Sequence, residues 1–173
     1  MEHEDHQDAV ATKFLELSAQ RMRRSSADIA HCCAQLTEAQ LWHRAGDYEN
    51  SVANLLLHLE GNMRQWILHG VAGEPDVRER DAEFTLTPTT AGAEALARLQ
   101  ATLEASCAAI LATPPERLLE IIDPQPTGRS RYPTVLEAIL QVVSHLREHT
   151  GQIILLTKQH TARDLDLSMP RKR

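Results

Sequence analysis

Four long segments of this sequence carry apolar side chains at the spacing of a helix, and this pattern constrains the fold more than any other feature. The first runs from about Asp8 to Leu36 without a Gly or a Pro. The others cover about 51–69, 89–112 and 134–160. Because apolar residues three or four positions apart lie on one face of a helix, each segment has a face to bury against the others. The sequence therefore predicts an all-α fold, a four-helix bundle.

The connections between these segments predict short extra helical turns. Thr37-Glu-Ala-Gln40 has the spacing of a capping box and starts one such turn. A second turn is expected at 116–119, within a stretch that is rich in proline. Thr134 and Glu137 form another capping box, which opens the last long helix.

The end of the second long helix and the stretch after it are less regular. Gly70 and Gly73 are expected to end the helix, because glycine adopts left-handed backbone angles at little cost. The stretch 74–87 lacks periodicity and is predicted to be a loop, with Phe84 packing back onto the bundle. Three of its charged residues are interpreted as surface charges or as an edge of a site: Arg78, Arg80 and Asp81.

Composition and charge argue against several classes of protein. The formal net charge is −6, so the surface as a whole offers no positive field for nucleic acid or for an anionic membrane. The first ten residues, MEHEDHQDAV, are acidic where a secretion signal needs a positive segment followed by an apolar one. We expect a cytoplasmic protein with a single domain over 1–173, of which 163–173 is a polar tail with no assigned role for its basic end.

The three cysteines indicate neither a disulfide framework nor a zinc ribbon. Cys32, Cys33 and Cys107 are odd in number and have no Cys-x-x-Cys spacing. We interpret them as small buried apolar side chains.

A pair of histidines on the last helix is the strongest chemical signal. His145 and His149 are four residues apart, so both imidazoles leave the same face of a helix and can bind one ion. The surrounding sequence is strongly apolar, and buried polar groups there need partners. Spacing of this kind also occurs by chance, and the alternative is a set of hydrogen-bonded core histidines without a metal.

A third ligand has to come from another helix, and His58, near the middle of the second long helix, is the natural candidate. Taken alone, His58 is better explained as a hydrogen-bonded core residue, and its position and neighbours are what favour a ligand. The other six histidines lie near termini, surfaces, turns or helix ends, which favours surface or structural roles for them: His3, His6, His31, His43, His69 and His160.

Three fragments of the sequence together resemble the DinB-like superfamily, and more narrowly a branch of small bacterial proteins without an assigned reaction. The fragments are Asn50-Ser-Val-Ala-Asn-Leu-Leu-Leu-His58 with the residues up to Ile67, Arg78-Glu-Arg-Asp-Ala-Glu-Phe84, and Ser144-His145-Leu-Arg-Glu-His149-Thr-Gly-Gln152. The resemblance implies an up-down bundle with an unusual connection, a homodimer, and a metal site on His58, His145 and His149. Better-understood relatives include metal-dependent S-transferases and isomerases that use low-molecular-weight thiols such as bacillithiol or mycothiol.

Three neutral imidazoles suit several divalent ions. The resemblance implies nickel or zinc first, with iron, cobalt or manganese as alternatives. Such a site leaves a position for water or substrate, which favours a transferase or hydrolase that acts on a small molecule, with a thiol as a possible cofactor. The rival hypothesis is a non-catalytic metal-binding protein. Asn62 and Gln152 are candidates for orienting a ligand or a substrate. Glu60 and Glu148 are bases by type, but their helical phase differs from that of the histidines, so no general base is assigned.

Overall fold

The protein is all-helical in a computed structural model that describes residues 2–123, 126 and 132–167. Helices appear in chain order as α1 (Glu2–Cys33), α2 (Glu38–Trp42), α3 (Val52–Met63), η1 (Arg64–His69), η2 (Arg80–Phe84), α4 (Gly92–Leu111), η3 (Pro115–Leu119) and α5 (Val135–Thr161). Within those described ranges the only β-type pairing is an isolated bridge between Ile121 and Thr134. The predicted all-α class is confirmed. The basic end of the polar tail, Arg171 to Arg173, lies outside the described residues.

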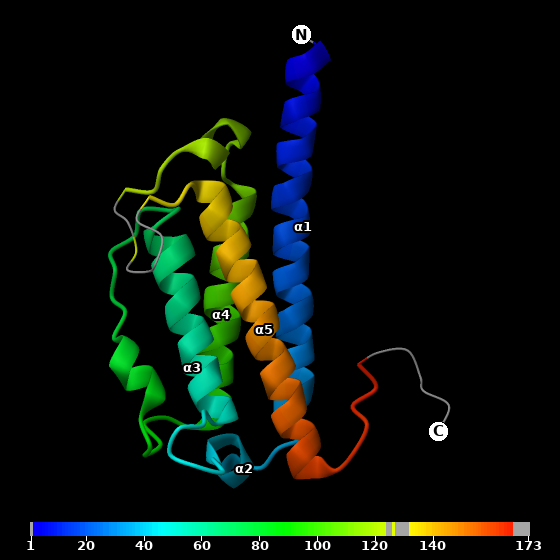
Figure 1. Ribbon diagram of the computed structural model, residues 1–173, viewed down its shortest axis with the longest axis vertical. Helices are drawn as coiled ribbons and strands as arrows, with labels where there is room; N and C mark the ends of the chain where they lie inside the picture. The colour runs from blue at the N-terminus through cyan, green and yellow to red at the C-terminus, as the bar shows by residue number, and fades with distance from the viewer. Residues whose placement is uncertain (1, 124–125, 127–131, 168–173) are drawn as a thin grey trace.

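Four long helices lie side by side, and the direction of each determines where the connections run. In Figure 1, α1 and α5 run down the molecule, whereas α3 and α4 run up it. Helix α3 packs against α4 and α5, and α1 packs against the same two helices. Because α3 and α4 are parallel, the segment 70–91 has to return along the outside of α3 before α4 begins. This return brings η2 against α3.

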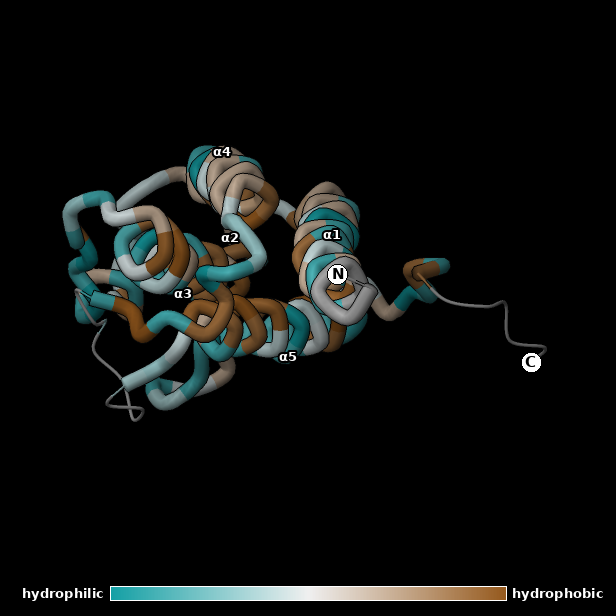
Figure 2. The backbone as a smooth tube through the Cα atoms, turned by 90° about the horizontal axis from the view of Figure 1, so that it is seen from above, coloured by the Kyte–Doolittle hydropathy of each residue, from teal (hydrophilic) through white to brown (hydrophobic). Residues whose placement is uncertain are grey.

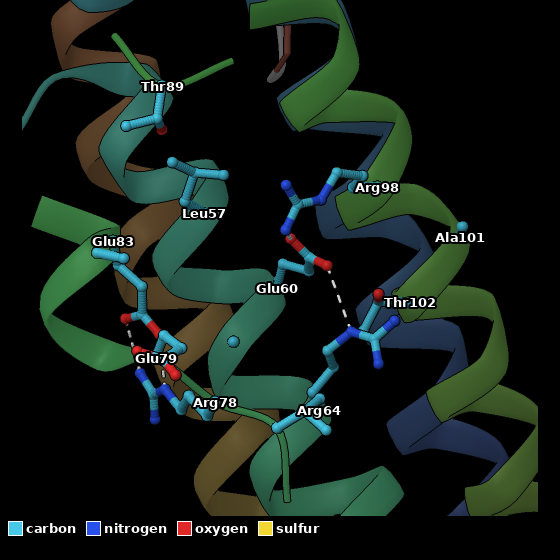
Figure 3. A pocket seen from close by; sticks show the side chains of 13 residues that line it. Leu57, Glu60, Arg64, Arg78, Glu79, Glu83, Thr89, Arg98, Ala101 and Thr102 are labelled. Atoms are coloured by element: carbon cyan, nitrogen blue, oxygen red, sulfur yellow. Dashed lines mark hydrogen bonds and ion pairs between the residues drawn. The ribbon is translucent and has the colours of Figure 1, made fainter. Parts of the chain in front are cut away.

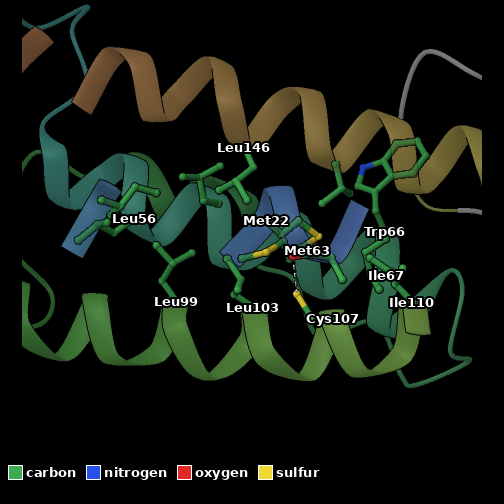
Figure 4. Close-up of a cluster of buried hydrophobic side chains, with 14 of the residues drawn as sticks. Met22, Leu56, Met63, Trp66, Ile67, Leu99, Leu103, Cys107, Ile110 and Leu146 are labelled. Atoms are coloured by element: carbon green, nitrogen blue, oxygen red, sulfur yellow. Dashed lines mark hydrogen bonds between the residues drawn. The ribbon is translucent and has the colours of Figure 1, made fainter. Parts of the chain in front are cut away.

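The core lies between the four long helices and is built mainly from aliphatic side chains. Seen from above, the apolar parts of the helices face the centre of the bundle (Figure 2). Met22, Leu56, Leu99, Leu103 and Ile110 are among the side chains that are fully buried there (Figure 4). Burial of each such side chain contributes about 1.5–3 kcal/mol relative to an exposed one, so this layer is the main source of stability.

Side-chain caps fix the starts of three helices, and two of these caps were predicted from the sequence. Thr37 and Thr134 form capping boxes with Gln40 and Glu137. Ser51 caps α3 and also forms a capping box, with Asn54 as its partner. Helix α4 begins later than expected, at Gly92 instead of about residue 89.

The start of α4 depends on a tertiary contact that its own sequence does not reveal. The cap residue Ala91 has no side-chain oxygen to offer. Instead, both carboxylate oxygens of Glu38 accept from the Gly92 backbone N–H, at 2.9 and 3.1 Å. A carboxylate at a helix N-terminus is favoured by the partial positive charge of the unpaired N–H groups.

The prediction for Gly70 is wrong in its mechanism. Gly70 keeps right-handed helical angles, with φ −68° and ψ −40°, and only Gly73 has a positive φ, of 79°. Gly70 is needed for a close approach instead, because a Cβ there would overlap the Trp66 carbonyl oxygen and press on Ile122.

The second long helix ends in a π-helical turn, η1, a form often found near functional sites. No described helix combines the length and hydropathy that crossing a bilayer requires.

Candidate metal centre

His58, His145 and His149 converge on one point between α3 and α5. One ring nitrogen from each lies within 4.8 Å of the others. The three rings stand nearly at right angles, with interplanar angles of 74°, 90° and 86° and centroids 4.9, 5.1 and 4.4 Å apart. Among the described residues, this group includes no fourth His, Cys, Asp or Glu. The fold therefore brings together the three histidines that the sequence singled out.

In two of the three histidines, His58 and His149, the Nδ1 atom contacts a neighbouring side chain that orients the ring. The Nδ1 atom of His58 lies 2.8 Å from Glu83 Oε2, and Nδ1 of His149 lies 2.7 Å from Gln152 Oε1. Both oxygens accept from an Nδ1–H, which places the lone pair of each ring on Nε2, the nitrogen that can bind an ion. Hydrogen bonds of this kind fix the tautomer and orientation of a metal-binding histidine and raise its basicity.

Glu83 is held in place by Arg78, which the sequence left as a surface charge or an edge of the site. The Arg78 side chain is only 6% exposed. Its Nε donates to Glu83 Oε1 at 2.7 Å and its Nη2 to Oε2 at 2.9 Å, as a two-pronged ion pair. Nη1 donates to Gln65 Oε1 on η1 at 3.0 Å. The surface interpretation of Arg78 is therefore wrong, because the returning segment buries this residue against α3.

Helix η2, which carries Glu83, is tied to the start of α3 by two side chains. Asn54 Nδ2 donates to the Glu83 carbonyl at 2.9 Å and to the Thr85 carbonyl at 3.2 Å. Arg44 Nη2 donates to the carbonyls of Phe84 and Thr85, at 3.0 and 2.9 Å, and to Asn54 Oδ1 at 2.6 Å. These bonds satisfy the carbonyls at the end of a short 3₁₀ helix that the sequence did not predict.

Two further features press η2 onto α3. Phe84 packs back onto the bundle, as expected, with its ring 5.0 Å from the ring of His58. At Gly61 the helix has no side chain, and an added Cβ would overlap Glu83 Oε1. Glycine near the C-terminal end of α3 is thus what allows the carboxylate to reach His58.

The remaining sequence candidates have different surroundings. Asn62 is buried one turn after His58, and its amide makes no hydrogen bond to a described residue. Glu60 faces away from the histidines and is paired with Arg64 and Arg98. Glu148 is exposed. Neither glutamate contacts the triad.

Burial keeps the imidazoles of α5 neutral. Burial first, and then the nearby rings of His149 and His58, lower the pKa of His145 to about 4. Burial also lowers the pKa of His149, against the opposing effect of its bond with Gln152. For Glu83, burial alone would raise the pKa, but hydrogen bonds from Arg78 and His58 outweigh it and the pKa is lowered. Near neutral pH the two imidazoles of α5 are therefore uncharged and the Glu83 carboxylate is ionised, and metal binding requires deprotonated ligands of this kind.

The donor set fits a divalent ion after a small adjustment. His58 Nε2 and His145 Nε2 lie 2.8 Å apart, within hydrogen-bond distance. Two nitrogens on one tetrahedral zinc, with bonds of about 2.0–2.1 Å, are separated by about 3.3 Å. These two rings have to move apart by about half an ångström, which side-chain rotation can supply.

The cysteines take no part in this site. All three are free and buried, as the sequence suggested. Burial raises the pKa of Cys33 to about 12 and that of Cys107 to about 11, and it raises the pKa of Cys32 as well. At neutral pH these groups stay protonated, so they are neither metal ligands nor nucleophiles.

Comparison with known proteins assigns the chain to a family but not to a reaction. A search of functionally curated proteins found no match. One family model, described as "Protein of unknown function (DUF1572)", matches residues 9–173 and so includes all three histidines, Arg78 and Glu83. The chain belongs to the DUF1572 family.

Proposed function

We propose that the protein binds one divalent metal ion through His58, His145 and His149 and uses it as a transferase or hydrolase that acts on a small molecule. The observation that carries this proposal is the pair of oriented imidazoles. A histidine whose Nδ1–H is held by a carboxylate or an amide presents Nε2 to a common point, as metal ligands do. The resemblance to the DinB-like superfamily and the four long packed helices support the same site.

Three protein ligands favour chemistry over a purely structural role. Structural zinc sites are closed by four protein ligands, whereas catalytic sites keep one position for water or substrate. When bound, the ion would lower the pKa of a water or hold a thiol as its thiolate. Of the chain's own groups, Glu83 keeps His58 aligned and Gln152 keeps His149 aligned.

We propose zinc or nickel from the resemblance, and three imidazoles suit both, as they also suit iron or cobalt. A low-molecular-weight thiol as co-substrate, a homodimer and a cytoplasmic location are proposed from the resemblance. The runner-up function is a metal-binding protein without catalysis, which the buried position of His58 favours, since little of that ring is accessible.

Elemental analysis of protein purified without oxygen and without chelators tests the site first. We expect about one ion per chain in the natural sequence and in His31→Ala, an exposed histidine outside the triad. His145→Ala and His149→Ala should lose it. Equal metal content in all four proteins, or none in any, would reject the site.

Catalysis is tested separately. The natural sequence should turn over thiol conjugates or simple esters. His149→Ala should not, although its helical circular dichroism signal should be unchanged. Metal-loaded protein that turns over neither substrate class would leave the non-catalytic function as the better account.

A further inference from the structure

A pocket of about 520 Å³ lies on the other side of α3 from the histidines, between α3, α4 and the returning segment (Figure 3). None of the three histidines lines it. Its volume lies within the range of small-molecule sites, about 300–1,000 Å³. Small side chains, Ala101 and Thr102 of α4 and Gly61 of α3, leave the space open.

A buried carboxylate at the wall of this pocket holds two arginines. The Glu60 side chain is 7% exposed, and each of its oxygens has one partner: Arg64 Nε at 3.3 Å from Oε1, and Arg98 Nη2 at 2.8 Å from Oε2. Burying a carboxylate this deeply costs free energy unless it is paired and hydrogen-bonded. Figure 3 shows the two guanidinium groups on either side of Glu60, one from each helix.

Both arginines retain unused donors. The Arg64 and Arg98 side chains are 43% and 50% exposed, and each uses a single nitrogen on Glu60. Within the described part of the chain, neither has another ion pair or hydrogen bond. A guanidinium has five N–H donors in a planar fork that matches a carboxylate or a phosphate. Glu60 thus holds two guanidinium groups in place, and their remaining N–H groups are available to a ligand.

The charge of the pocket selects between these two anions. Arg78 also lines it but is already occupied by Glu83 and Gln65. The three glutamates of the lining, Glu60, Glu79 and Glu83, balance its three arginines in formal charge, so the pocket has no net positive charge to favour a doubly charged anion over a singly charged one. The apolar part of a ligand finds Leu57 and Ala101 in the same wall.

We propose that this pocket binds a small organic molecule through one carboxylate, held by Arg64 and Arg98, with its apolar part against α3 and α4. The site is separate from the histidines, and the proposal holds whether or not the metal is catalytic.

Amide NMR of the full-length chain, titrated with butyrate and separately with inorganic phosphate at constant ionic strength, tests the proposal. Butyrate should shift the amide signals of Gly61, Ala101 and Thr102 saturably, and phosphate should bind more weakly. Arg98→Gln should weaken butyrate binding by about tenfold or more, because it removes charge-assisted hydrogen bonds. Arg23→Gln, which breaks an exposed ion pair with Glu104 elsewhere on α4, should change it by less than about twofold.

Loss of Arg98 could also disturb Glu60, so a second variant tests butyrate binding without removing a charge. Ala101 is exposed on α4, so Ala101→Leu fills the pocket without removing a charge or harming the helix. It should abolish butyrate binding. Unsaturable shifts, shifts that stay the same in Ala101→Leu, or tighter binding of phosphate than of butyrate would each overturn the proposal.

Discussion

His58 and Glu83 are 25 positions apart in the sequence, yet His58 Nδ1 and Glu83 Oε2 are separated by only 2.8 Å. The carboxylate comes from the returning segment, not from one of the four long helices. It reaches His58 because α3 and α4 are parallel, which makes the chain between them run back along α3. The unusual connection of the bundle therefore supplies the group that orients one of the proposed ligands.

Glu83→Gln should weaken metal binding while keeping the size of the side chain. The amide can still accept from His58 but no longer carries the charge that raises the basicity of the ring. Changes to such partners typically cost about 10–100-fold in metal affinity. Competition with a chromophoric zinc chelator measures the change. Glu104→Gln, an exposed carboxylate on α4, is the matched control, and equal affinities in the two variants would remove Glu83 from the site.

Gly61→Ala and Gly151→Ala should have opposite effects. Both glycines lie inside helices, where alanine is favoured by about 1 kcal/mol. Gly151 has open space around it, so its substitution should raise the free energy of unfolding by about 0.5–1 kcal/mol. At Gly61 the new methyl group would displace Glu83, so stability should fall and metal affinity with it. Urea unfolding of both variants decides the matter, and a gain at both positions would contradict the close approach.

The stability of the metal-free protein should fall between about pH 6.5 and pH 4 through His145. The ordinary pKa of 6.5 applies to the unfolded chain, whereas burial holds the folded value at about 4. Above pH 6.5 neither state is protonated at His145. Below it the unfolded chain takes up a proton that the folded chain does not, so stability is lost until about pH 4 and not further. His149 acts in the same direction.

Urea unfolding across this pH range, with a chelator present, compares the natural sequence with His145→Gln. Between pH 6.5 and pH 4 the free energy of unfolding should fall by about 1–2 kcal/mol less in the variant than in the natural sequence. This difference is smaller than the whole pKa shift would give, because the ring is partly accessible to solvent. Parallel pH profiles for the two proteins would show that His145 is not buried as a neutral imidazole.

Arg44→Met should loosen η2 without touching the histidines. The substitution removes the donors to the Phe84 and Thr85 carbonyls, and hydrogen bonds from a charged group contribute about 1.5–3 kcal/mol. Faster hydrogen exchange at Ala82, whose amide bonds to Glu79, and weaker zinc binding are expected. Arg23→Met, which removes an exposed ion pair, should cost less than about 1 kcal/mol. Unchanged exchange at Ala82 would mean that Arg44 does not hold η2.

Local sequence signals predicted most of the helical framework. The capping boxes of Thr37 and Thr134 each act within four residues, and their geometry is as expected. The pairing of His145 with His149 is equally local, because helix geometry alone puts them on one face. The description of the DUF1572 family names no reaction, and the thiol-dependent chemistry is proposed from the resemblance alone.

Contacts between distant segments were beyond the reach of these signals. Arg78 and Glu83 occur in a stretch without periodicity, and their pairing with His58 depends on how the chain returns along α3. The role of Gly61 could not be predicted, because a glycine within a helix usually only destabilises that helix. The late start of α4 has the same origin, because Glu38 caps it from 54 residues away.

The Arg78–Glu83 ion pair has two sides. On one side Glu83 is bonded to His58, and on the other side the ion pair forms part of the wall of the pocket that also contains Glu60. One pair of side chains cannot adopt different positions for two sites at once. If an occupant of the pocket shifts this pair, the triad's affinity for its ion changes by some factor. Thermodynamic reciprocity then requires that loading the triad changes the pocket's affinity by the same factor.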